Sequence, residues 1–196
     1  MFVAIDLSEE ARSEIAALVL SLRKHGADVK WVELQNLHLT LKFLPDVEDS
    51  KQDALHKAFS PLARSFTPFQ LRLVGVGGFP DVGRPKILWV GAAEGSEHVK
   101  QLAASIESVL ELAGFARESR PFQVHLTVGR VRSAKKLAPL MDQIKKMPFS
   151  SVHGFQVNSL TLYRSTLTSA QPVYEVIGKF PLGTRETPSP DPEQWR

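Results

Sequence analysis

Four stretches of the chain place hydrophobic residues at helical spacing. The first runs from Ser8 to about His25, and its apolar face consists of Ala11, Ile15, Leu18, Val19 and Leu22. Ser8 can cap the helix N-terminus through its hydroxyl, and Gly26 is a common helix stop. The pattern therefore predicts an amphipathic helix that packs one face onto a core.

Three more helices are predicted from the same spacing. The second opens at Ser50-x-x-Asp53, which resembles a capping box. The third begins near Ser96 and ends before Gly114, and the fourth begins near Ser133. All four helices have an apolar side, so each is expected to cover a sheet.

Runs typical of β-strands lie between the helices. They span residues 2–7, 29–32, 37–44, 69–77, 86–92, 122–131, 152–163 and 173–181. Within one of them, Gly75-Val-Gly-Gly78 indicates a bulge or turn rather than a phosphate-binding loop.

Two of these runs carry the same pattern, His38-Leu-Thr40-Leu and His125-Leu-Thr127-Val. Because alternate side chains of a strand share a face, each His points with its Thr while the apolar residues point to the core. The repetition suggests a site in which two imidazoles and two hydroxyls face one cleft.

The order of elements around the two patterns is also repeated. Helix, short strand, His-x-Thr strand, helix and strand occur over residues 8–77 and again over 96–163. The order predicts an α+β fold of two pseudo-symmetric lobes, each an antiparallel β-sheet with helices on its outer side, forming a central cleft. We expect one domain over 1–182 and a disordered tail over 183–196, where proline and charged residues are frequent.

Two histidines in one cleft can act as general base and general acid near neutral pH. The neutral ring removes a proton from a nucleophile, and the protonated ring gives one to a leaving oxygen. Each threonine can donate a hydrogen bond to an oxyanion between the rings. The arrangement suits in-line displacement at phosphorus and predicts a metal-free phosphoesterase.

Other interpretations fit the residues less well. Two histidines supply half of a tetrahedral zinc site, but no His, Asp or Glu lies beside them at ligand spacing. No G-x-S-x-G sequence is present for a serine hydrolase. A purely structural role for the His-x-Thr strands stays open. A structural role suffices for the four other histidines, His25, His56, His98 and His153.

Composition narrows the setting without identifying a partner. The 196 residues include no cysteine, which excludes disulfides and thiol chemistry, and the formal net charge is +3. This excess permits a polyanionic ligand but does not require one. No apolar run approaches the ~20 residues of a membrane span, and the first residues lack a signal-peptide pattern. We expect a soluble, monomeric protein of the cytoplasm.

The chain resembles the 2H phosphoesterase superfamily, and within it the RNA 2′,3′-cyclic phosphodiesterases that are also called 2′-5′ RNA ligases. Both His-x-Thr motifs carry the flanks typical of that branch, and further likeness extends over most of 1–182. The matching segments are residues 31–44, 121–131, 2–5, 84–89 and 162–165. Pro45 and Val124 depart from the family pattern, and neither position carries a reacting group.

The resemblance implies hydrolysis of a 2′,3′-cyclic phosphate at an RNA end to a 2′-phosphomonoester, with reversible 2′-5′ RNA ligase activity as a further capacity. It implies His125 as general base and His38 as general acid, with Thr40 and Thr127 holding the phosphoryl oxygens. It implies no metal and no cofactor. The expected partners are RNA ends or nucleotides with a 2′,3′-cyclic phosphate, and no membrane.

Lys42 and Arg130 are candidate substrate-binding residues. Lys42 shares the parity of His38 along its strand, so its ammonium could reach a phosphate. Arg130 matches a family arginine near the site, but strict alternation turns it away from the second histidine. Its role therefore requires a bulge at Gly129.

Two further interpretations remain open from the sequence. One keeps the fold and changes the substrate to a 2′,5′-linked oligonucleotide or a small cyclic nucleotide. The other is a module that binds RNA ends without turning them over. In either case Phe43 and Phe79 are candidates for stacking on a base, or for the core.

Overall fold

The structure is a computed structural model that describes residues 1–45, 47–168 and 171–183. The strands are β1 (Phe2–Asp6), β2 (Val29–Trp31), β3 (His38–Phe43), β4 (Phe69–Leu71), β5 (Leu73–Phe79), β6 (Ile87–Ala92), β7 (Leu126–Val131), β8 (Phe155–Val157), β9 (Ser159–Leu167) and β10 (Pro172–Pro181). The helices are α1 (Glu9–Arg23), α2 (Gln52–Arg64), α3 (Ser96–Leu112) and α4 (Leu137–Lys146), with short 3-10 helices η1 (Leu34–Asn36) and η2 (Asp49–Lys51). The tail predicted over 183–196 lies outside the described residues except for Gly183.

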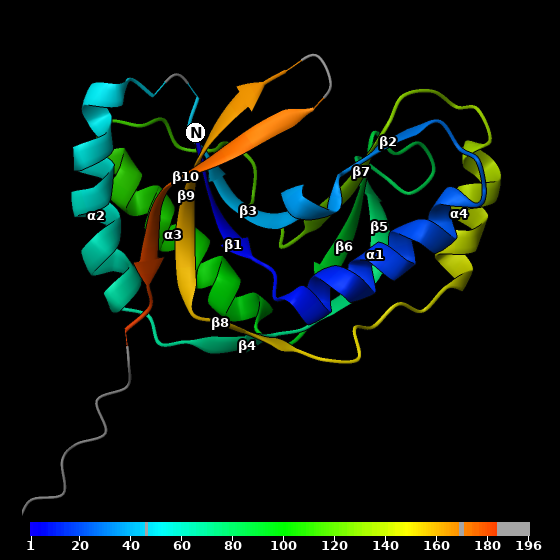
Figure 1. The fold of residues 1–196 in the computed structure, drawn as a ribbon, viewed down its shortest axis with the longest axis horizontal. Helices are drawn as coiled ribbons and strands as arrows, with labels where there is room; N and C mark the ends of the chain where they lie inside the picture. The colour runs from blue at the N-terminus through cyan, green and yellow to red at the C-terminus, as the bar shows by residue number, and fades with distance from the viewer. Residues whose placement is uncertain (46, 169–170, 184–196) are drawn as a thin grey trace, which may run out of the picture.

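Two antiparallel four-stranded sheets form the framework (Figure 1). The first sheet has the order β10-β9-β1-β3 and the second the order β2-β7-β6-β5, while β4 and β8 pair in a separate ribbon. The helices α2 and α3 pack beside the first sheet, and α1 and α4 lie beside the second. The predicted α+β class with two lobes is confirmed.

The two sheets do not correspond to the two halves of the sequence. β9 and β10 come from the second half but extend the sheet of β1 and β3, and β2 and β5 come from the first half but flank β6 and β7. The helix α3 likewise crosses over to contact β3. Each lobe is therefore built from both halves, which differs from two half-domains that merely face each other. The duplication over 8–77 and 96–163 stays a prediction.

Helix starts test the predicted caps. The Ser8 hydroxyl accepts a hydrogen bond from the Ala11 N–H at 3.2 Å, as expected. The capping box at Ser50 is wrong, because η2 precedes α2 and Lys51 occupies the N-cap position. The last helix begins at Leu137 rather than at Ser133, whose hydroxyl donates to Asp28.

Three predicted strands are interrupted or shorter than expected. The run 69–77 divides into β4 and β5 at Arg72, the run 152–163 divides at Asn158, and regular pairing in 122–131 begins only at Leu126. The predicted bulge among the glycines is confirmed, since the register of β5 against β6 shifts at Gly75, whose φ is +67°.

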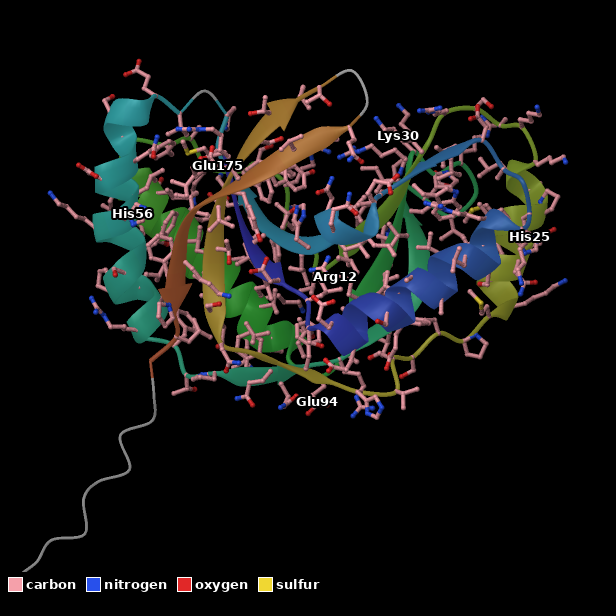
Figure 2. All side chains as sticks on the ribbon, in the orientation of Figure 1. Arg12, His25, Lys30, His56, Glu94 and Glu175 are labelled. Carbon is pink, nitrogen blue, oxygen red and sulfur yellow. The ribbon has the colours of Figure 1, made fainter. Side chains whose placement is uncertain are left out.

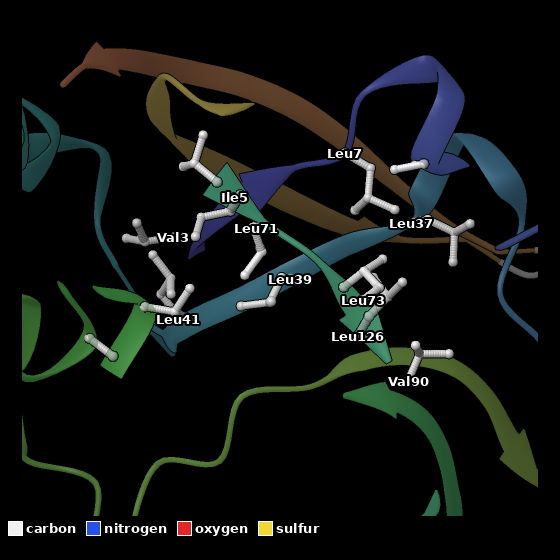
Figure 3. Packing of buried hydrophobic residues seen from close by; sticks show 14 of the residues in the cluster. Val3, Ile5, Leu7, Leu37, Leu39, Leu41, Leu71, Leu73, Val90 and Leu126 are labelled. Carbon is white, nitrogen blue, oxygen red and sulfur yellow. The ribbon is translucent and has the colours of Figure 1, made fainter. Parts of the chain in front are cut away.

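The apolar positions of the two His-x-Thr motifs anchor both strands in one core. Leu39 and Leu41 are 1% and 5% exposed, and Leu126 and Val128 are fully buried. Figure 3 shows the side chains of β3 directed into the cluster formed with β4, β5 and β6. Burial of these residues orients the intervening polar side chains the other way. Among the described residues, no helix is long and apolar enough to cross a membrane.

Candidate active site

The two histidines have the same local anchor. His38 Nδ1 lies 2.7 Å from the backbone carbonyl oxygen of Asn36, and His125 Nδ1 lies 2.7 Å from that of Gln123. In both motifs the partner is therefore the carbonyl two residues earlier. A carbonyl oxygen only accepts hydrogen bonds, so Nδ1 carries a hydrogen in each ring. This leaves Nε2 of each histidine as the nitrogen that can take up or release a proton.

A cleft of about 450 Å³ lies between the two sheets. His38 and Thr40 line it from the first sheet, and Thr127 and Arg130 line it from the second. His125 is not among the lining residues. It immediately precedes β7 and lies two positions before Thr127. Four of the six predicted site residues thus share this cleft, and β3 and β7, the strands that carry or follow the histidines, contact each other.

A bulge in β3 determines which side chains reach the cleft. The register of β3 against β1 shifts after Thr40, with Leu41 as the extra residue. As a result Leu41 and Lys42 are both buried, whereas Phe43 is 61% exposed and lines the cleft with Thr40. Phe43, which the sequence left between stacking and core, is therefore at the cleft surface.

The second motif has the same bulge at the equivalent position. The register of β7 against β6 shifts after Thr127, with Val128 as the extra residue. Val128 and Gly129 are buried, and the exposed Arg130 lines the cleft. The bulge that Arg130 requires was predicted at Gly129 and lies one residue earlier. Arg130 also acts across the cleft, since its charge opposes the rise in the pKa of Tyr174 that burial causes.

Lys42 does not enter the cleft, which corrects its predicted contact with a phosphate. Its side chain is 7% exposed, and Nζ lies 2.7 Å from Glu107 Oε1 of α3. Nζ also donates to the carbonyl oxygen of Ala116 at 3.0 Å. The parity argument failed because the extra residue at Leu41 reverses the alternation. Lys42 ties β3 to α3 and to the segment that follows it.

Aromatic rings surround His38. Its imidazole stacks on Phe2 with a centroid distance of 4.6 Å and meets Tyr174 edge-on at 5.3 Å. Burial among these rings lowers the pKa of His38, because a charged imidazole loses hydration there. The hydrogen bond to Asn36 and the negative charge of Asp6 oppose this effect. Burial therefore disfavours the protonated ring, and an anion bound in the cleft would favour it.

Asp6 is an unpredicted residue beside the site. It pairs with His38 across β1 and β3, and its two carboxylate oxygens accept hydrogen bonds from the hydroxyls of Thr161 (2.7 Å) and Tyr163 (2.6 Å). Burial and these contacts raise the pKa of Tyr163, so its hydroxyl stays protonated. Two features of the sequence could have pointed to Asp6 and Tyr163: an acidic residue directly follows the apolar run 2–5, and the chain contains only two tyrosines.

His125 lies in a more open setting. Its ring meets Phe79 edge-on at 5.1 Å, and Phe79 in turn lies 5.2 Å from the Trp89 ring. Phe79, the second stacking candidate, is half-buried and contacts the ring of His125, and it is not among the residues that line the cleft. The Trp89 ring occupies the space that a side chain at Gly77 would need, since a Cβ there would lie 2.3 Å from it.

The remaining histidines do not line the cleft, in keeping with structural roles. His56 Nε2 contacts the Ile177 carbonyl oxygen at 3.1 Å, and His98 stacks on Phe69 at 5.0 Å. Figure 2 shows His25 and His56 at opposite outer ends of the molecule. Within the described residues, no group of three or more His, Cys, Asp or Glu is placed to hold a metal ion.

Sequence comparisons connect this geometry to known proteins. A family model described as the 2′-5′ RNA ligase superfamily matches residues 8–168. A protein of Aquifex aeolicus named RNA 2′,3′-cyclic phosphodiesterase is 35% identical over 157 residues, covering 79% of this chain and 82% of the relative. A protein of Archaeoglobus fulgidus with the same name is 34% identical over 180 residues, covering 92% and 98%.

Solved structures agree with these relatives. The crystal structure of TT0787 of Thermus thermophilus superposes with a TM-score of 0.78 at 29% identity, covering 94% of this chain and 98% of that one. The crystal structure of Escherichia coli LigT complexed with 3′-AMP superposes with a TM-score of 0.71 at 28% identity, covering 92% and 96%.

Proposed function

The chain belongs to the 2′-5′ RNA ligase superfamily, and from this premise we propose that it is a hydrolase that opens 2′,3′-cyclic phosphates at RNA ends to 2′-phosphomonoesters. The relatives are named for this activity, and the chain matches them over most of their length. The observation that supports it most directly is the pair of His-x-Thr motifs, each with its Nδ1 anchored and its Nε2 free, on two strands that contact each other.

The proposed mechanism uses the two Nε2 atoms in opposite directions. His125 Nε2 takes a proton from water as the water oxygen attacks phosphorus. The bond from phosphorus to the 3′ oxygen breaks, and that oxygen takes the proton of His38 Nε2–H. Thr40 and Thr127 donate hydrogen bonds to the phosphoryl oxygens, and Arg130 offsets their charge. After the product leaves, His125 releases its proton to solvent and His38 takes one up, which restores both starting states. These proton transfers require no metal or cofactor.

The position of the phosphate on the product tests the proposed reaction. We expect an RNA with a 2′,3′-cyclic phosphate end to yield a terminal 2′-phosphate and a free 3′ hydroxyl, at an unchanged rate in EDTA. Phosphatase treatment and chromatography against synthetic 2′- and 3′-phosphate standards identify the product. A 3′-phosphate product would reverse the leaving group. Activity abolished in EDTA and restored by a divalent metal would refute the metal-free mechanism.

The pH dependence tests which histidine is the acid. A general acid works only while protonated, so its pKa sets the basic limb of the profile. Burial lowers the pKa of His38 in the free protein, and a bound phosphate raises it again. We therefore expect the basic limb of kcat/KM at lower pH than the basic limb of kcat.

The variant Asp6→Asn tests this assignment, and Glu94→Gln is its control. Asp6 raises the pKa of His38, so its loss should move the basic limb of kcat/KM to still lower pH. Glu94→Gln, at an exposed position paired with Arg72, should leave the profile unchanged. If Asp6→Asn moves the acidic limb instead, His38 is the base and the roles are exchanged. The monomeric state, the cytoplasmic location and the ligase activity stay predictions.

A further inference from the structure

A second groove adjoins the candidate active site. It has a volume of about 770 Å³ and is bordered by the segment 82–86 between β5 and β6, the end of β7 with the residues that follow it, and helix α4. Arg132, which follows β7, lines both this groove and the cleft. The two hollows therefore meet at one side chain. The proposed reaction uses only the cleft, which leaves the second groove without an assigned function.

Positive charge is concentrated along these two hollows. The cleft is lined by Arg23, Lys30, Arg130 and Arg132, and the second groove by Arg84, Lys86, Lys145 and again Arg132. Glu33 and Asp142 are the acidic residues of the two linings. The seven cations and two anions give the two linings a net charge of +5, which exceeds the net charge of +3 of the whole chain. The rest of the chain is therefore acidic on balance.

These cations lack carboxylate partners among the described residues. All seven are exposed, and in the described part of the chain none of them forms an ion pair with a carboxylate. Lys30 and Arg130 are even direct cross-strand partners of β2 and β7. Like charges placed opposite each other destabilise a sheet, so this pair is typical of a surface whose counter-charge is supplied by a ligand.

The second groove combines these cations with apolar side chains. Its lining includes Leu137, Ala138 and Met141 of α4 as well as Arg84, Lys86 and Lys145. Lys30 of β2, which is labelled in Figure 2, lines the cleft. A lining of cations and apolar side chains matches the phosphates and the riboses or base edges that a single RNA strand presents.

We propose that the second groove binds the RNA nucleotides upstream of the terminal cyclic phosphate, and that Arg132 contacts the strand where it passes from the cleft into the groove. This inference rests on the proposed function and adds a substrate preference to it. An RNA chain gains interactions along the groove that a mononucleotide cannot make. The protein should therefore hydrolyse an oligoribonucleotide cyclic phosphate with a higher kcat/KM than the matching mononucleotide.

The double variant Arg84→Glu, Lys145→Glu tests the groove, because both side chains are exposed and distant from the two His-x-Thr motifs in sequence. We expect kcat/KM for the oligoribonucleotide to fall about tenfold or more relative to the mononucleotide. The slope of its logarithm against the logarithm of salt concentration should flatten by about 0.7 for each phosphate that the variant no longer binds. Lys57→Glu, Lys179→Glu is the matched control: it makes the same charge change at exposed positions that line neither hollow.

Three outcomes would contradict the groove. They are an equal loss on both substrates, an equal loss in the control variant, and an unchanged preference for the oligoribonucleotide. A parent protein that hydrolyses neither substrate would instead refute the proposed function. In that case, fluorescence anisotropy with a labelled oligoribonucleotide bearing a 2′-phosphate still tests whether the groove binds RNA. The parent must bind it about tenfold more tightly than the Arg84, Lys145 double variant.

Discussion

His38→Ala and His125→Ala are each expected to lower kcat for a 2′,3′-cyclic phosphate by about 10²–10⁴-fold, because each removes one proton-transfer step. The double variant should be little worse than the slower single variant, since the two rings act in one concerted exchange. Single-turnover hydrolysis of an end-labelled RNA measures the chemical step directly. The anchored Nδ1 of both rings makes the expected losses similar in size.

The controls separate chemistry from folding. His153→Ala removes an imidazole at an exposed position and should leave kcat unchanged. His38 contributes ring contacts with Phe2 and Tyr174, so thermal unfolding of His38→Ala must be compared with that of the parent. If both single variants are folded and turn over within about threefold of the parent, the two-histidine mechanism is refuted and a binding module becomes the better interpretation.

Lys42→Met is expected to destabilise the fold by about 3 kcal/mol, because it leaves Glu107 charged and largely buried without its partner. Glu107 keeps 19% of its surface exposed, which places the effect at the lower end for buried pairs. The double variant Lys42→Met, Glu107→Leu should recover most of the loss, since two apolar side chains then pack where two charges were. Urea unfolding of the single and double variants measures the coupling.

The exposed pair Lys100–Glu97 is the matched control. Its charged atoms lie 2.6 Å apart, but both side chains are at least half exposed, so Lys100→Met should cost less than about 1 kcal/mol. The same experiment tests the phosphate contact predicted for Lys42 from the sequence. If Lys42→Met leaves stability within about 1 kcal/mol of the parent and raises KM tenfold, the lysine binds substrate after all.

The equivalent bulges at Leu41 and Val128 explain how two similar motifs produce an asymmetric cleft. Each bulge brings the residue three positions after the threonine to the cleft surface. In the first strand that residue is Phe43, and in the second it is Arg130. One wall therefore offers an aromatic ring and the other a cation, which is the pair of contacts that a nucleotide with its phosphate can use.

Local patterns were sufficient for much of this protein. Apolar spacing located the four α-helices of the described chain, and the Ser8 cap formed as expected. The repeated His-x-Thr pattern assigned the buried and cleft-facing sides of β3 and β7, because two-residue alternation and burial act on each strand separately. The later helix start after Ser133 and the displaced cap at Ser50 show where one polar residue was too little information.

Long-range pairing decided the rest. Whether Lys42 or Phe43 faces the cleft depends on one extra residue in the ladder with β1, and Arg130 depends on the same event against β6. The exchange of β5 and β9 between the lobes, the Asp6 contact to Tyr163, and the junction at Arg132 each join residues remote in the chain. Periodicity carries no information about which strands become neighbours or in which register, since that choice comes from the packing of the whole core.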